Sequence, residues 1–127
     1  MTKQELAMQI KHGASPCNCC QAVIRVFQEE LGLTEEQAMR LGSAFGGGLG
    51  CGKGPCGALC GAEMVLSLAD NKNRDVRAAS TKILNEFLNQ VGALICEDIK
   101  DGAAGQALCS CDDCIRYAVS IAEKILS

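Results

Sequence analysis

The chain is poor in aromatic residues, proline and histidine. Its 127 residues include no tryptophan, one tyrosine, three phenylalanines, two prolines and one histidine. Stacking on nucleobases requires aromatic side chains, and binding to phosphate backbones requires an excess of positive charge. The net charge of −3 and the pI near 5.1 supply no such excess. We therefore expect no nucleic-acid partner.

Long apolar segments are also missing from the sequence. No run approaches the roughly 20 apolar residues that a membrane-spanning helix needs. The N-terminal segment MTKQELAMQIKHG mixes charged and apolar residues, and it lacks the apolar stretch of about 7–15 residues found in secretory signals. We expect a single domain over residues 1–127, with no membrane span and a cytoplasmic location.

Cysteine and glycine, in contrast, are abundant, with ten cysteines and 14 glycines. Thiols stay reduced in the cytoplasm, so metal binding or redox chemistry explains ten cysteines better than a disulfide scaffold does. Free cysteine is also a small apolar residue, and individual cysteines can simply fill core positions.

Apolar residues recur at helical spacing almost throughout, which predicts an all-α fold, a compact bundle of five to six helices. Ser15 and Pro16 indicate a helix start, and Thr34 with Gln37 forms a capping box. Six glycines in residues 46–55 predict a loop before the fourth helix. The expected helices are a short one ending near Gly13, then 17–31, one after Thr34, 56–69, about 76–91, and a last one from about 111.

The cysteines gather at three of the expected helix starts. The groups are Cys17, Cys19 and Cys20; Cys51, Cys56 and Cys60; and Cys109, Cys111 and Cys114, with Cys96 standing alone. A helix N-terminus lowers the pKa of a thiol because its free N–H groups stabilise the thiolate. The glycine loop can add N–H groups that face an anion, a cluster sulfide or a thiolate.

The spacing of the cysteines does not select one chemistry. Cys17 with Cys20 and Cys111 with Cys114 form C-x-x-C pairs, which occur in zinc sites and in dithiol redox sites. The intervals match neither a zinc ribbon nor a ferredoxin, so the fold must assemble any site.

Two other features of the sequence have structural explanations without a role in binding. Gly57 and Gly61 are expected to let two helices approach closely, and His12 is expected to face solvent.

Three segments carry a resemblance to a known family. They are N-C-C-Q-A-V from Asn18, F-G-G-G-L-G from Phe45 and C-G-A-L-C-G-A from Cys56. Together they resemble the bacterial and archaeal C_GCAxxG_C_C family, and the resemblance implies redox activity. A related domain in split-Soret cytochromes holds an iron–sulfur centre. The family cysteines carry over as Cys19, Cys56, Cys96 and Cys111, with Cys114 a rival for the last.

These observations lead to three hypotheses. The first is an electron-transfer or redox-sensing protein with a cysteine-ligated iron–sulfur cluster and an unidentified redox partner protein. Its metal ligands are expected to be Cys19, Cys56, Cys96 and Cys111, with cofactor contacts from Gly46, Gly47, Gly48 and Gly57. Secondary ligand candidates are Cys17, Cys20, Cys51, Cys60, Cys109 and Cys114.

The second hypothesis is a thiol–disulfide or peroxide-reducing enzyme. Cys56 is its nucleophile, resolved by Cys19, Cys51 or Cys60. The third is a structural zinc site, or cysteines used only for packing, in a helical bundle. A single site requires the N-termini of the second, fourth and last helices to meet at one end of the bundle, with residues 46–54 folded across them.

Overall fold

A computed structural model describes residues 1–102 and 105–127 of the chain, and over these residues it contains helices and no β-strand. The all-α prediction is therefore confirmed. The α-helices are α1 (Lys3–Lys11), α2 (Cys19–Val26), α3 (Glu35–Gly42), α4 (Gly57–Leu68), α5 (Val76–Val91), α6 (Cys96–Asp101) and α7 (Cys111–Leu126). A short π-helical turn, η1 (Gly48–Gly52), lies within the glycine loop.

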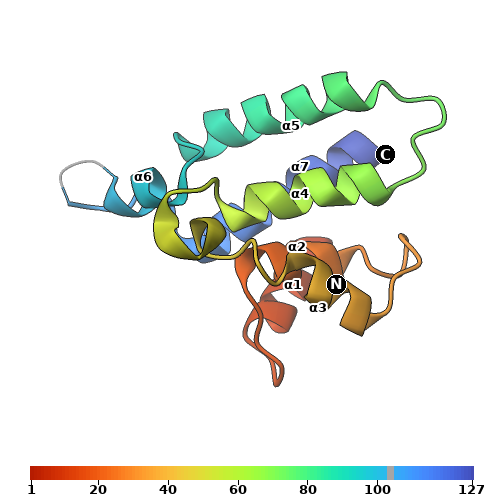
Figure 1. Cartoon of the computed structure of the whole chain (residues 1–127), viewed down its shortest axis with the longest axis horizontal. Coiled ribbons are helices and arrows are strands. Elements are labelled where there is room, and N and C mark those ends of the chain that lie inside the picture. The colour runs from red at the N-terminus through yellow and green to blue at the C-terminus, as the bar shows by residue number, and fades with distance from the viewer. Residues whose placement is uncertain (103–104) are drawn as a thin grey trace.

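Helix α4 lies at the centre of the bundle. It packs against α2 on one side and α5 on the other, and α7 crosses behind it (Figure 1). Helix α1 packs on α2 and α7, and α3 packs on α2. Helix α6 lies beyond the end of the bundle, beside η1. The starts of α4 and α7 therefore lie near the end of the molecule that carries the glycine loop.

Side-chain caps set most of the helix starts. Asn18 accepts a hydrogen bond from the backbone N–H of Gln21, and the Gln21 side chain accepts one from the Asn18 N–H. Thr34 and Gln37 form the same capping box at α3, as predicted. Ser110 caps α7 in the same manner, by accepting from the Asp113 N–H. Each such cap satisfies donors that the first helical turn leaves free.

The second helix is shorter than the predicted span of 17–31. It begins at Cys19 because Asn18, with its capping box, is a stronger start signal than Ser15 and Pro16. It ends at Val26, and a series of turns then leads to Gly32, whose φ is +70°. Cys17 consequently lies before the helix.

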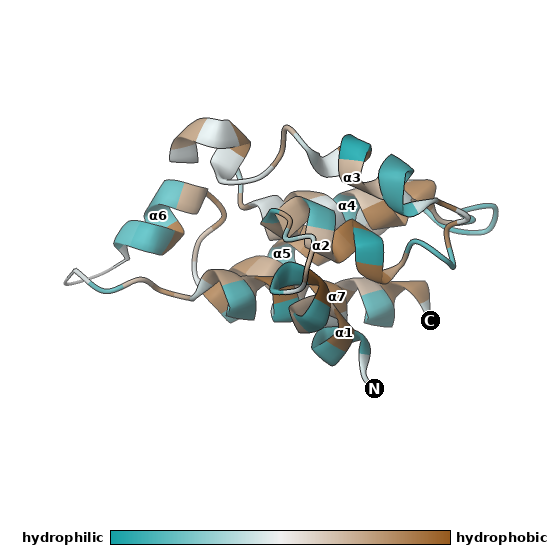
Figure 2. Cartoon of the chain, turned by 90° about the horizontal axis from the view of Figure 1, so that it is seen from below, coloured by the Kyte–Doolittle hydropathy of each residue, from teal (hydrophilic) through white to brown (hydrophobic). Residues whose placement is uncertain are grey.

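The core is built from the apolar faces of α2, α4, α5 and α7. Ile24, Leu66, Ile83, Phe87 and Ile115 are among its largest fully buried side chains. Coloured by hydropathy, α7 and α4 turn apolar surface inward, whereas α6 is largely hydrophilic (Figure 2). The bundle thus has an apolar core to which α6 contributes mainly Ile99.

Gly57 and Gly61 allow α2 and α4 to approach closely, as predicted. A Cβ atom at Gly61 would lie 2.8 Å from Cβ of Val23 and 3.0 Å from the Cys20 carbonyl oxygen. One at Gly57 would lie 2.8 Å from the Phe45 carbonyl oxygen. These distances are too short for any side chain larger than that of glycine, so both glycines have a packing role.

Two features of the chain were not predicted. The glycine loop contains the η1 turn, in which Leu49 and Gly50 have positive φ values of 60° and 81°. Helix α6 occupies part of the expected connection over residues 96–110, and Ile95 at its N-cap provides no side-chain cap. Without a capping residue and with only six residues, α6 leaves little signal in the sequence.

Within the described residues, no helix is both long enough and apolar enough to span a membrane.

Candidate cysteine site

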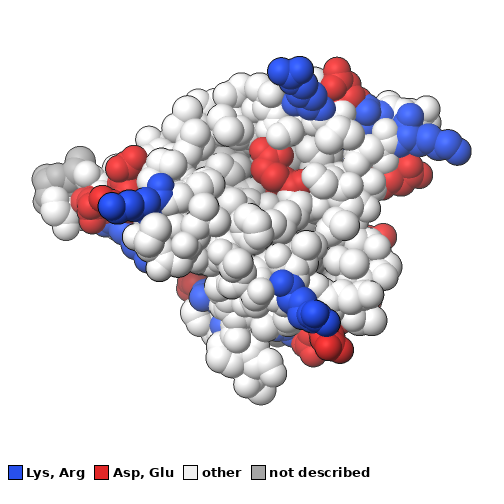
Figure 3. All heavy atoms as spheres, viewed as in Figure 1, with Lys and Arg blue, Asp and Glu red and all other residues white. Residues whose placement is uncertain are grey.

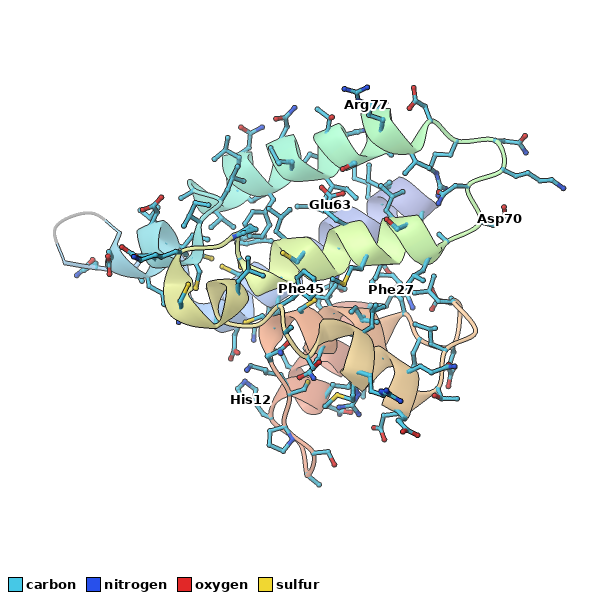
Figure 4. The ribbon with its side chains drawn as sticks, viewed as in Figure 1. His12, Phe27, Phe45, Glu63, Asp70 and Arg77 are labelled. Carbon is cyan, nitrogen blue, oxygen red and sulfur yellow. The ribbon has the colours of Figure 1, made fainter. Side chains whose placement is uncertain are left out.

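Cysteines from four separate segments line one small cavity at the loop end of the bundle. The cavity has a volume of about 40 Å³. Its walls are formed by Cys19, Cys56, Cys96, Cys109, Cys111 and Cys114, with Gly47, Gly57, Ile99 and Lys100. Sulfur atoms are concentrated around the glycine loop and the first turns of α4 (Figure 4). We call this arrangement the six-cysteine cavity.

Three of the cavity cysteines lie at helix starts. Cys19 is the first residue of α2, Cys56 is the N-cap of α4, and Cys111 is the first residue of α7. The predicted convergence of these N-termini is confirmed, since all three cysteines line the same cavity together with Gly47 of the glycine loop. The free N–H groups and positive dipole ends of the helices favour negative charge at this point.

Cys96 reaches the cavity through a short antiparallel pairing of two loop segments. Its N–H donates to the Gly54 carbonyl over 3.0 Å, and the Cys56 N–H donates to the Leu94 carbonyl over 2.8 Å. Pro55 and Ile95 face each other between these two bonds. The pairing fixes the glycine loop to the start of α6 and brings Cys56 and Cys96 to one cavity.

The loop glycines predicted to contact a cofactor have different positions. Gly47 and Gly57 line the cavity. Gly46 packs on Asn18, where a Cβ atom would lie 2.4 Å from the Asn18 Cβ. Gly48 packs on Cys96, where a Cβ atom would lie 2.5 Å from the Cys96 Cβ. Gly46 and Gly48 therefore hold the two sides of the site close to the loop.

Cys56 has a pKa well below that of an ordinary thiol. The hydrogen bond from Cys114, the backbone N–H groups of Ala58 and Leu59 and the charge of Lys100 lower its pKa to about 6, against the effect of burial. The same Cys56–Cys114 contact, with burial, raises the pKa of Cys114. At neutral pH the pair thus consists of a Cys56 thiolate and a Cys114 thiol.

Cys19, Cys96 and Cys109 hold their protons more tightly than an ordinary thiol does. Burial, with repulsion from Cys111 and Cys56, raises the pKa of Cys19 to about 12. Burial also raises the pKa of Cys96 and of Cys109, with Lys100 opposing the effect at Cys96 and a hydrogen bond from Cys114 opposing it at Cys109. Several thiolates in one cavity repel one another, and positive charge from a metal relieves that repulsion.

Nowhere in residues 1–102 and 105–127 are three or more His, Cys, Asp or Glu side chains arranged so as to hold a metal ion. A single zinc ion requires sulfurs about 2.3 Å from a common centre. The cavity cysteines include hydrogen-bonded pairs, Cys56 with Cys114 and Cys19 with Cys111, around one common space. A metal centre bound by three or more of them would require their sulfur atoms to shift from these positions.

The remaining cysteines do not line the cavity. Cys17 is buried before α2, and exposed Cys51 lies in η1, where its S–H points to the Gly48 carbonyl. Cys20 is fully buried on α2, and Cys60 is half-buried on α4. Of the three resolving cysteines proposed for Cys56, only Cys19 lines the cavity, and the hydrogen-bonded neighbour is Cys114.

Lys100 lines the cavity, whereas His12 does not. Lys100 was not recognised in the sequence, although it follows Cys96 by one helical turn. His12 projects from the α1 end of the molecule (Figure 4), with its side chain largely exposed, as expected. Its Nε2 lies 2.8 Å from Oδ2 of Asp112, in the first turn of α7.

Comparison with family models gives one informative match. Residues 17–125 match the family described as "Putative redox-active protein (C_GCAxxG_C_C)". The chain belongs to this family. The matched segment of the C_GCAxxG_C_C family contains all ten cysteines of the chain and every wall of the six-cysteine cavity. Searches of curated proteins and of solved structures returned no match.

Proposed function

We propose that this chain is an electron-transfer or redox-sensing protein whose six-cysteine cavity holds an iron–sulfur cluster. The observation that carries the proposal is the convergence of six cysteines from four segments on one cavity. A dithiol enzyme needs two or three thiols at its site. Protein-bound iron–sulfur clusters, in contrast, are held by several cysteine thiolates. Membership in a redox-active family agrees with either chemistry.

Cys19, Cys56, Cys96 and Cys111 are the proposed ligands. Each stands at or next to a helix start, where its backbone is fixed by caps or by loop pairing. When bound, a cluster supplies a centre that accepts and releases electrons at a potential set by its surroundings.

The chain's own residues set the charge around such a centre. The Lys100 ammonium and the N–H groups at the start of α4 offset negative charge at Cys56. Hydrogen bonds and positive charge near cluster sulfurs raise a reduction potential, because they stabilise the more negative reduced state. Buried Ile99 lies on the cavity wall and limits access of water.

A second candidate function is supported by the Cys56–Cys114 pair. The Cys56 thiolate attacks a sulfur of a substrate disulfide and displaces one substrate thiolate, which takes a proton from solvent. Cys114 then loses its proton and attacks the mixed disulfide, releasing the second substrate thiol. The substrate disulfide gains two electrons, and Cys56 and Cys114 lose them as they form a disulfide. The lowered pKa of Cys56 favours this chemistry.

Alkylation of the native protein under anaerobic conditions distinguishes the two functions. Cys111 and Cys51 are both exposed thiols, but only Cys111 lines the cavity. A bound cluster should protect Cys111 from iodoacetamide while Cys51 reacts, as mapped by mass spectrometry. After acid and chelator treatment and refolding, Cys111 should react as fast as Cys51. Rapid labelling of Cys111 in native protein, together with a selectively reactive Cys56, contradicts the cluster and supports the dithiol.

A further inference from the structure

A second group of sulfur atoms lies outside the six-cysteine cavity. Sγ of Cys20, on α2, is 3.7 Å from Sδ of Met64, on α4. Cys60 and Met64 are separated by one helical turn on α4, and both pack against the small apolar cluster that contains Cys20. The thiols of Cys20 and Cys60 also lie within electrostatic reach of each other. One thiol and one thioether thus meet between the two helices, and a second thiol, that of Cys60, lies near them.

The close approach of α2 and α4 explains how the three sulfurs meet. Gly61 follows Cys60 directly, and its Cα faces the Cys20 carbonyl and Val23. A larger residue at Gly61 would separate the helices and with them Cys20 from Met64. The group is therefore fixed by backbone packing and does not depend on the glycine loop or on α6.

The surroundings of this group are apolar on one side and open on the other. Cys20 is fully buried beside Ile24 and Ala38. Cys60 and Met64 are half-buried and line a surface hollow of about 350 Å³, which Phe45 also borders. Figure 4 shows Phe45 near the first turns of α4. Glu63 also lines the hollow, and Figure 3 shows an acidic group near the centre of this face with few other charged side chains around it. A ligand can enter from the hollow and reach a site sheltered from water.

From this arrangement we propose that Cys20, Cys60 and Met64 form a binding site for a monovalent copper ion, Cu(I). Thiolate and thioether sulfurs are soft ligands, and a set of two cysteines and one methionine suits Cu(I) better than a hard cation. Binding replaces two S–H protons, which leave to solvent, and involves no electron transfer. The site has a net charge of −1 when filled.

The Cu(I) site is independent of the proposed iron–sulfur cluster. None of its three residues lines the six-cysteine cavity. The methionine at the site also offers a direct probe, because the chain has only four methionines. Labelling the methionine methyl groups with carbon-13 gives one resonance for each, and Met64→Leu identifies the resonance of Met64.

The experiment titrates the reduced full-length chain with Cu(I), supplied as its acetonitrile complex under anaerobic conditions. The Met64 methyl resonance should shift and saturate in the wild type. It should do the same in Cys51→Ser, which removes an exposed thiol outside both sites. A competing chelator sets the concentration of free Cu(I). In Cys60→Ser, the half-maximal shift of the Met64 resonance should require at least about tenfold more free Cu(I) than in the wild type. Cu(I) taken up by the six-cysteine cavity leaves the Met64 resonance unchanged.

The methyl resonances of Met8 and Met39, both packed against the core, report whether Cys60→Ser is folded. The proposal is overturned if the Met64 resonance stays in place until the chain is saturated with Cu(I). It is also overturned if a folded Cys60→Ser responds as the wild type does. Iron analysis of the protein is unaffected by either result, so a failure here is distinguishable from a failure of the cluster proposal.

Discussion

Cys56 differs from its neighbours in the six-cysteine cavity because several donors converge on its sulfur. Cys114, the N–H groups of Ala58 and Leu59, and Lys100 stabilise its thiolate, whereas burial dominates at Cys19 and Cys96. Cys56 and Cys19 line the same cavity, but their thiols differ in pKa because the fold gives them different neighbours. The sequence indicated a helix start at Cys56, but it could not show that Cys114 donates to it.

This difference predicts the thiol titration of reduced, metal-free protein. Because the pKa of Cys56 is lowered to about 6, one thiolate should appear as the pH rises through about 6. The rise in ultraviolet thiolate absorbance in that range should vanish in Cys56→Ser and persist in Cys51→Ser. A wild-type protein that gains no thiolate below pH 8, or a Cys56→Ser variant that keeps the step, contradicts the assignment.

At the scale of helices, the caps decide where the cysteines stand. The Thr34–Gln37 capping box and the span of about 76–91 for α5 were readable from sequence, because local chemistry such as the left-handed Gly92 cap sets these limits. The start of α2 was misplaced by two residues because Asn18, with Gln21, competes with Ser15 and Pro16. Helix α6 was missed because its position depends on the pairing of Gly54 with Cys96, which no local pattern reveals.

The α2 cap should matter to the site as well as to stability. Asn18 caps α2 next to Cys19, and its Nδ2 donates to the Gly42 carbonyl over 3.1 Å. Asn18→Ala should lower the free energy of unfolding by about 1–2 kcal/mol, measured by chemical denaturation. It should also change the visible spectrum of the metal-loaded protein, because the cap no longer holds the backbone of the proposed ligand Cys19 in position.

Thr34→Ala is the matched control, since it removes the equivalent cap from α3, which contributes no residue to the cavity. It should lower stability by a similar amount and leave the spectrum unchanged. Identical spectral effects of the two variants would contradict a specific role for the Asn18 cap in positioning Cys19.

At the scale of the whole molecule, packing between segments far apart in the sequence assembles the cysteine site. The single-site hypothesis required the starts of α2, α4 and α7 to meet, and the packing of α2 and α7 against α4 brings them to one cavity. Cys96 was expected at the site only because of the family resemblance. The structure shows the pairing of two loop segments that brings it to the cavity. Cys109 was a secondary candidate and Cys114 a rival to Cys111, because their spacing in the sequence does not show which of these side chains reach the cavity.

The apolar core and the cysteine site adjoin each other. The core lies among α1, α2, α4, α5 and α7, and its buried cluster includes Cys56, Cys114 and Ile99. These three residues also line the six-cysteine cavity, at the end where the glycine loop and α6 are attached (Figure 1). The apolar contacts that hold the helices together therefore also form part of the cavity wall.

The central claim is that the six-cysteine cavity holds an iron–sulfur cluster, and the most direct test is the iron and acid-labile sulfide content per chain after anaerobic purification. The account predicts a coloured protein containing both iron and sulfide in comparable amounts, because the cavity provides several thiolates around a sheltered space. A colourless protein with ten free thiols, which takes up neither iron nor sulfide on reconstitution, would contradict it.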